Sequence, residues 1–283
     1  MAATTVERVR SNPTLYGETG FHPRALLALA IAGWAAWCEE HLVPIAELMH
    51  THGIGFPLST AELRYPVPSR YTGAAAFETA TTVVFRRPRD TALSCDTTVS
   101  LAGRQIAEVR LTAGVSHLDP AVLCGAGLGP MPAALLDRLP ADHRGAPRRH
   151  SPVPAALDRL AAEGGPVVEH THPFTLHRHL CEVGDQWTFV PVPDLFAAAR
   201  DELLLAHADT RPLLRSTWAR PLRSLDFDIH RPLGFLESAT VRTTAHLRPE
   251  GPAFSHRIVS ARGETHATAV ETFHPVPTPQ EHR

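Results

Sequence analysis

Ionisable side chains stand just before each of two predicted helices. Glu182 and Asp185 precede the second helix, and Glu18 and His22 precede the first. A carboxylate within hydrogen-bond reach of a carbonyl or a water molecule can act as a general base, and a histidine changes its charge near neutral pH. Both segments are therefore candidate sites for acid–base chemistry. The competing interpretation is a solvated turn acid, or a residue that simply begins a helix.

Asp201 is a further candidate because it lies inside the second predicted helix. An acid at this position that faces a cleft could act as a general acid or base. Its neighbours Arg200 and Glu202 are instead typical of a solvated helix face, which is the favoured interpretation.

The densest group of histidines could bind a metal. It comprises His170, His172, His177 and His179, with Cys181 following. Strand alternation would place the last two histidines on one face, and imidazole and thiolate are usual zinc ligands. No pattern fixes the first pair relative to the second, so a polar strand face is favoured. We expect no metal and no other cofactor.

The chain contains an internal duplication. Residues 18–20 match 182–184, and residues 63–79 match 227–243, both at an offset of 164. Residues 99–103 match 259–263 at an offset of 160. The change of offset falls at a predicted hairpin tip, where changes of length are tolerated. Three matches in the same order indicate two copies of one module.

Each copy combines a helix with alternating strands. We expect helices at about 23–42 and 193–207. The strands are expected near 63–67, 75–79, 93–101 and 105–114, and again near 225–229, 239–243, 254–261 and 265–273. The first helix is apolar around its circumference, which predicts burial on all sides, whereas the second is amphipathic.

A segment rich in Pro, Gly, Ala and Arg separates the copies. It shows helical patches at 132–139 and 153–163 and is expected to cross the surface. The predicted division is therefore an N-terminal module at 1–117, a linker at 118–167 and a C-terminal module at 168–283.

Two segments of each copy resemble the 4-hydroxybenzoyl-CoA thioesterase-like branch of the hot-dog superfamily. They are 37–40 and 65–73 in the first copy, and 195–204 and 229–235 in the second. The resemblance implies an α+β fold in which an antiparallel sheet wraps each long helix. Two tandem modules would pair their sheets as an intramolecular pseudo-dimer, with the strands around Arg110 and Thr268 near the junction.

A second resemblance rests on other residues of the same regions. Residues 20–22, 26–27, 33–34, 189 and 195–198 resemble tandem hot-dog enzymes of polyketide clusters, of the leinamycin acyltransferase/decarboxylase type. Those enzymes also handle acyl groups on coenzyme A and on carrier proteins.

The resemblance implies an acyl-thioester site at the seam between modules. The family's catalytic acid usually stands in the turn before the helix or inside it, but here Gly20 and Gly184 occupy the turn positions and residues 30–34 hold no acid. The remaining candidates are Glu182, Asp185 and Asp201 in one copy, and Glu18 and His22 in the other. This asymmetry predicts one working site, served by residues 182–185 and facing the first helix, and one degenerate site.

Candidate substrate contacts follow from the same resemblance. Trp34 and Phe196 on the two helices could line an acyl tunnel. Arg70 and Arg231 could meet the phosphates of coenzyme A or phosphopantetheine, beside Tyr71 and Phe235. A charge at a strand edge is an equal alternative for each arginine.

The composition limits the possible partners. The chain has 43% hydrophobic residues, 20% charged residues and a net charge of −2, which offers no broad basic field for nucleic acid or an anionic membrane. Four widely spaced cysteines and an N-terminus without an apolar stretch favour the cytoplasm, and the longest apolar run, 25–38, is too short to span a bilayer. All 27 basic residues are arginine, which is typical of a GC-rich, actinobacterial genome.

The leading hypothesis is an enzyme that acts on an acyl thioester, most simply a thioesterase of polyketide-type secondary metabolism. Its partners would be acyl-CoA or a phosphopantetheine-bound acyl group on a carrier protein, and the chain would be a monomeric pseudo-dimer or a homodimer of it. A dehydratase, a cyclase or an acyltransferase/decarboxylase is the first alternative. A non-catalytic acyl-binding module is the second.

Overall fold

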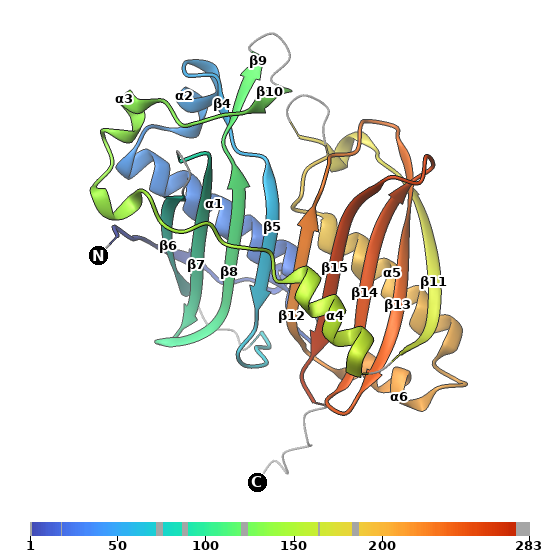
Figure 1. The fold of residues 1–283 in the computed structure, drawn as a ribbon. Coiled ribbons are helices and arrows are strands. Elements are labelled where there is room, and N and C mark those ends of the chain that lie inside the picture. The colour runs from blue at the N-terminus through green and yellow to red at the C-terminus, as the bar shows by residue number, and fades with distance from the viewer. Residues whose placement is uncertain are drawn as a thin grey trace.

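A ten-stranded antiparallel sheet is the framework of the protein in the computed structural model, which describes residues 2–17, 19–71, 76–86, 90–119, 124–163, 165–182 and 187–275. The strand order is β1-β6-β7-β8-β5-β12-β15-β14-β13-β11, so each half of the chain supplies five neighbouring strands (Figure 1). The first five are β1 (Thr5–Arg10), β6 (Ala76–Arg86), β7 (Ala92–Leu101), β8 (Arg104–Gly114) and β5 (Leu58–Arg64). The second five are β12 (Leu222–Ile229), β15 (Thr265–Phe273), β14 (Gly251–Ser260), β13 (Ser238–Arg248) and β11 (Pro166–Thr175).

Two long helices lie on the same face of this sheet, one behind each half in Figure 1. They are α1 (Pro23–His41) and α5 (Val192–His207), and both have proline in the first turn, where its missing N–H costs nothing. In α5 the buried residues recur every three or four positions, at Phe196, Ala199 and Leu203, as one face of a helix requires. In the strands every second residue points to the helices, which gives a continuous core.

The structure corrects the prediction that α1 is buried on all sides. Its core face holds Leu26, Leu27, Ala30, Gly33, Trp34, Trp37 and Cys38. Ala28 and Ala32 are exposed, and Leu29 and Ile31 are only partly buried. The sheet covers one side of the helix and α5 makes a small contact with it, so small and apolar residues remain at the surface.

The two halves join where β5 pairs with β12. The register places Glu62 opposite Asp226 and Leu63 opposite Leu225. The repeat offset of 164 also relates Glu62 to Asp226, so the local twofold axis passes between these two acids. Arg110 on β8 and Thr268 on β15 each lie one strand away from the junction, next to it as expected but outside the joining pair.

A connecting segment crosses the face of the sheet opposite the helices (Figure 1). It contains α3 (Ala133–Leu136) and α4 (Val153–Glu163), and α4 packs on β15, β12 and β13. His143 anchors the segment, because its ring lies 2.6 Å from the carbonyl oxygen of Val83 on one side and 2.6 Å from the backbone nitrogen of Ala3 on the other. Both expected helical patches are confirmed, the first as a shorter helix.

The remaining elements are short. They are β2 (Tyr16–Gly17), β3 (Gly20–Phe21), α2 (Ile45–His50), β4 (Ile54–Gly55), β9 (Ser116–Asp119), β10 (Cys124–Leu128) and α6 (Pro212–Arg215). None of the helices in the described ranges is long and apolar enough to cross a membrane.

Candidate active site

A cavity of about 340 Å³ opens at one end of the seam, between the segment that leads into α1 and the side of α5. The first half of the chain contributes Gly17, residues 19–23, and the segment after β5 with Tyr65 and residues 67–69. The second half contributes one face of α5, the segment 217–222 that includes the end of a short 3-10 helix (Ser216–Ala219), and the end of β15. Both modules are therefore needed to build it.

A buried ion pair forms the wall of this cavity. The Glu271 side chain is 2% exposed and accepts a hydrogen bond of 2.8 Å from Nη1 of Arg200, while Nε2 of His256 lies 3.5 Å from the same carboxylate oxygen. His256 is fixed in turn by Thr243, whose hydroxyl lies 2.9 Å from Nδ1. Burial would raise the pKa of Glu271, but Arg200 and His256 outweigh it and lower the pKa to about 2. Glu271 is therefore a fixed negative charge at neutral pH.

Three side chains that line the same cavity carry buried hydroxyl groups without a hydrogen-bond partner in the described part of the chain. They belong to Tyr65, Ser69 and Thr217, which are 3%, 9% and 3% exposed. Burial, together with the nearby charge of Glu271, raises the pKa of Tyr65, so this phenol stays protonated and can donate. A buried hydroxyl without a partner costs about 1–3 kcal/mol, so three beside one cavity favour a polar group or ordered water there.

His22 and Asp201 stand at the rim of the cavity. His22 is the N-cap of α1, with an exposed ring that makes no capping hydrogen bond. A Cβ atom on Gly17 would lie 3.0 Å from Cε1 of His22, so the glycine makes room for this ring. Asp201 accepts a hydrogen bond of 3.2 Å from Nε of Arg200. Two of the predicted catalytic side chains are thus brought to one cavity from opposite modules.

The other three predicted catalytic residues are not part of this arrangement. Glu18 and Asp185 lie outside the described residues. Glu182 is exposed and does not line the cavity. Desolvation by the surrounding protein nevertheless raises its pKa, partly opposed by a hydrogen bond with Thr188.

The predicted substrate-binding residues are dispersed. Phe196 is fully buried and stacks on His256 at 5.0 Å between ring centroids, and Trp34 is buried against Phe56 at 5.2 Å. Arg70 and Tyr71 are exposed close to the cavity, on the segment that follows β5. Elsewhere, Arg231 is paired with Glu264 at 2.5 Å, and Phe235 lies 4.4 Å beneath the guanidinium of Arg178.

Arg200 and Glu271 are the main residues that sequence reasoning missed. The sequence interpretation of Arg200 as part of a solvated face is wrong, because its side chain is 17% exposed and bonded to a buried acid. A signal was present in β15, where Ala267, Ala269 and Phe273 form the core-facing row and Glu271 interrupts it. An acid in such a row is buried, and a buried charge requires a partner.

The histidine group has a structural explanation on the far edge of the sheet. His170 and His172 of β11 lie 3.1 and 2.8 Å from the two carboxylate oxygens of Glu202, which ties the edge strand to α5. His177 and His179 stack on each other at 6.2 Å. Within the described ranges no group of three or more His, Cys, Asp or Glu side chains could hold a metal ion.

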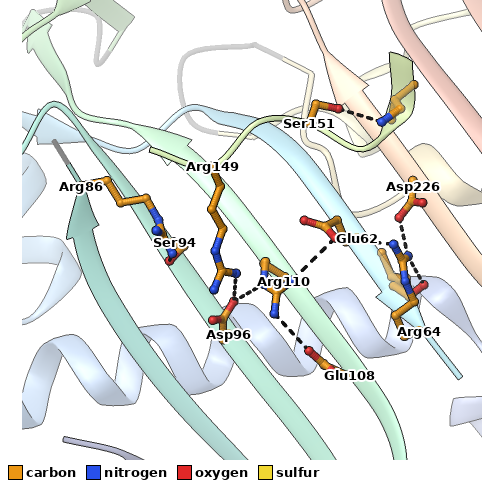
Figure 2. Close-up of polar contacts among 12 residues, drawn as sticks. Glu62, Arg64, Arg86, Ser94, Asp96, Glu108, Arg110, Arg149, Ser151 and Asp226 are labelled. Carbon is orange, nitrogen blue, oxygen red and sulfur yellow. Dashed lines mark hydrogen bonds and ion pairs between the residues drawn. The ribbon is translucent and has the colours of Figure 1, made fainter. Parts of the chain in front are cut away.

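A charge network covers the opposite face of the seam (Figure 2). Arg64 pairs with Asp226 and lies 3.5 Å from Glu62, so it bridges the two acids on the local twofold axis. Arg110 lies 2.8 Å from Asp96, 3.3 Å from Glu108 and 3.7 Å from Glu62. Burial raises the pKa of Glu62, Asp96 and Asp226 despite these arginines. The network neutralises a junction that would otherwise place like charges side by side.

The sequence matches no protein-family model and no curated protein, but the fold is known. A protein provisionally described as an oleoyl thioesterase from Lactobacillus plantarum matches with a TM-score of 0.72 at 11% identity, over 98% of both chains. A 12:0-ACP thioesterase from Umbellularia californica matches at 0.65 and 7% identity, over 96% of this chain and 97% of that one. An acyl-ACP thioesterase from Bacteroides thetaiotaomicron matches at 0.62 and 11%, over 95% and 97%. The chain therefore has the tandem hot-dog fold, as the sequence resemblance predicted.

Proposed function

We propose that the protein hydrolyses an acyl thioester in the seam cavity. The observation that carries this proposal is the joint lining of that cavity by two modules, with His22 from one and Asp201 and Glu271 from the other. The structurally similar proteins are described as thioesterases, two of them for acyl groups on a carrier protein, which supports the same substrate class here. Acyl-CoA and acyl-carrier-protein thioesters are the substrates to test.

The residues at the rim suit the role of general base. Asp201 or His22 would take a proton from water, whose oxygen then bonds to the thioester carbonyl carbon. When the carbon–sulfur bond breaks, the thiolate leaves and takes up a proton, which yields a free acid and a thiol. Glu271 is a poor base because Arg200 and His256 hold its pKa near 2, so it positions Arg200 instead.

The polar lining indicates the kind of acyl group. Tyr65, Ser69 and Thr217 line the cavity, and their hydroxyls have no partner in the described part of the chain. A plain hydrocarbon chain cannot satisfy them, whereas a hydroxy- or oxo-acyl group can. We therefore propose an oxygenated acyl group as the preferred substrate. This chemistry is compatible with polyketide-type secondary metabolism in the bacterial cytoplasm and with a monomeric pseudo-dimer, which stay proposals.

The turn at residues 182–185 is the competing location for the chemistry. It is related by the repeat to the segment before α1, and burial raises the pKa of Glu182. A direct comparison of variants decides between the seam cavity and residues 182–185.

The test measures thiol release from a panel of acyl-CoA and acyl-carrier-protein thioesters. We expect one of the two variants His22→Gln and Asp201→Asn to lose general-base catalysis, so that its kcat falls by about 10²–10⁴. Glu182→Gln and Asp185→Asn are the matching variants at residues 182–185 and should keep activity. Full activity in both cavity variants, with loss in a turn variant, would move the site to residues 182–185. No hydrolysis of any thioester by the wild-type protein would favour a non-catalytic acyl-binding module.

A further inference from the structure

A second and larger cavity, of about 880 Å³, lies at the other end of the seam. It is bounded by the start of β5, the end of β12, the ends of β6 and β8, and the connecting segment at residues 148–151. Its charged and titratable lining residues are Arg86, Arg148, Arg149, His150, Asp228, His230 and Arg231. The lining is therefore strongly cationic, although the whole chain has a net charge of −2.

Arg86 is a buried cation that pairs with no carboxylate among the described residues. It is 5% exposed and donates a hydrogen bond of 2.6 Å to the carbonyl oxygen of Pro147. It donates another, of 2.5 Å, to the hydroxyl of Ser94, which lies beside it in Figure 2. Its Nε–H group has no partner in the described part of the chain. The nearby acid, Asp96, already pairs with Arg110 and Arg149. Burial accordingly lowers the pKa of Arg86.

The other charged residues that line the cavity do not neutralise Arg86. Arg148 is exposed and has no ion pair in the described structure, whereas Arg231 is already paired with Glu264. Asp228 is the one carboxylate among the described lining residues, and hydroxyls of Thr60 and Ser151 bond its two oxygens at 2.8 and 2.7 Å. A buried charge without a counterion is costly, so an anion from outside the chain would stabilise this end of the seam.

We propose that this cavity binds a phosphoryl group. Guanidinium forks match phosphate oxygens in pairs, and the exposed Arg148 offers such a fork at a cavity that is large enough for more than a bare ion, while the buried Arg86 adds positive charge to the lining. The site lies at the opposite end of the seam from the candidate active site, and it does not depend on the proposed hydrolysis. Its ligand is either coenzyme A, through its phosphates, or a separate phosphorylated compound.

Titration calorimetry on the full chain tests the proposal, with pyrophosphate, coenzyme A and pantetheine as probes. Pyrophosphate should bind, more weakly as sodium chloride is raised, and pantetheine, which has no phosphate, should not use the site. Arg148→Ala should weaken pyrophosphate binding by about tenfold or more. Arg104→Ala is the matched control, because Arg104 is also exposed, has no ion pair in the described structure, and lies at the start of β8, outside the cavity.

The coenzyme A measurements identify the source of the phosphoryl group. If Arg148→Ala weakens the binding of coenzyme A and of pyrophosphate equally, the site binds coenzyme A. If it weakens the binding of pyrophosphate alone, the site binds a separate ligand. Arg86→Gln provides a second variant, although it also loses the bond to Pro147, so its folding must be checked first. The proposal is overturned if wild type binds neither phosphorylated probe, or if Arg148→Ala and Arg104→Ala bind as wild type does.

Discussion

Glu271 shows how one acid organises the candidate active site. It stands in the core-facing row of β15, and Arg200 and His256 hold it as an ion. The sequence named His22 and Asp201, which reach the same cavity, only as candidates behind Glu182 and Asp185, and it did not reveal this pair. The reason is that Arg200 and Asp201 are adjacent on α5, and only packing against β15 decides which of them is buried.

Replacing Glu271 with glutamine should strongly destabilise the fold. The change leaves Arg200 as a buried, uncompensated cation, which costs about 3–5 kcal/mol of unfolding free energy. Glu264→Gln breaks an exposed pair with Arg231 and should cost less than about 1 kcal/mol. Urea denaturation of both variants measures the difference, and equal stability would contradict the buried-pair interpretation.

The same pair predicts a loss of stability in acid. The folded pKa of Glu271 is about 2, below its ordinary value of 4.5. Its stabilising contribution is therefore complete above pH 4.5 and is lost as the pH falls from there toward 2. The Glu271→Gln variant should lack this decrease in stability when its free energy of unfolding is measured between pH 4.5 and pH 2.

The unpartnered hydroxyls make a prediction about selectivity. Tyr65→Phe and Thr217→Val remove a hydroxyl but keep the shape of the side chain, so the ratio of kcat/KM for a 3-hydroxyacyl-CoA over the plain acyl-CoA of equal length should fall. A net hydrogen-bond contribution of about 0.5–1.5 kcal/mol corresponds to roughly a two- to tenfold change for each hydroxyl. Ser238→Ala, on the distant β13, is the control. An unchanged ratio in both cavity variants would mean that ordered water satisfies the hydroxyls.

At the scale of elements, the repeat predicted most of the architecture. Helices near 23–42 and 193–207 and seven of the eight expected strands are confirmed, because strand alternation and the 164-residue repeat can be read directly from the sequence. The strand expected at 63–67 is a correction: β5 lies at Leu58–Arg64 and ends before Pro66 and Pro68, which have no backbone N–H to donate. The outer strands β1 and β11 and the joining pair β5–β12 were not identified as such. Strand order depends on which edges meet in space, and the alternation within a single strand does not encode it.

Two acids at the seam lower the free energy of unfolding at neutral pH, and substituting either of them should reduce this effect. Glu62 and Asp226 face each other on the local twofold axis, and the pKa of each is raised by burial. A raised folded pKa means that the folded state binds the proton more tightly, so these acids disfavour folding at neutral pH and less so as the pH falls.

Glu62→Gln or Asp226→Asn should therefore leave stability unchanged or raise it by up to about 1 kcal/mol at pH 7. The gain should shrink as the pH is lowered and the wild-type acids become protonated. Thermal unfolding at pH 7 and at pH 5 measures both effects, with Asp158→Asn on the exposed side of α4 as the control. A large loss of stability at pH 7 would show that the pairs with Arg64 and Arg110 outweigh the burial of the acids.

At the scale of the whole molecule, the sheet ends at β1 and β11. Glu7, Arg8 and Arg10 stand on one edge strand, and Glu169 and Pro173 on the other. Charges and proline on an edge strand discourage pairing with further chains. The strands that a hot-dog homodimer would join are instead joined within the chain, at β5 and β12. The division at residues 117 and 167 stays a prediction, which cleavage of the chain between the modules can test.

A protease site inserted at Gly165 should yield two pieces that stay together. Gly165 is exposed between α4 and β11, so cutting there breaks none of the strand pairs that cross the seam. The pieces remain joined by the β5–β12 ladder, by the contact of α1 with α5, and by α4, which belongs to the first piece but packs on β15 and β12 of the second. Size-exclusion chromatography with light scattering should give the mass of one chain before and after cleavage, and the two pieces should separate only in denaturant. Separation in native buffer would show that the connecting segment, rather than the seam, holds the modules together.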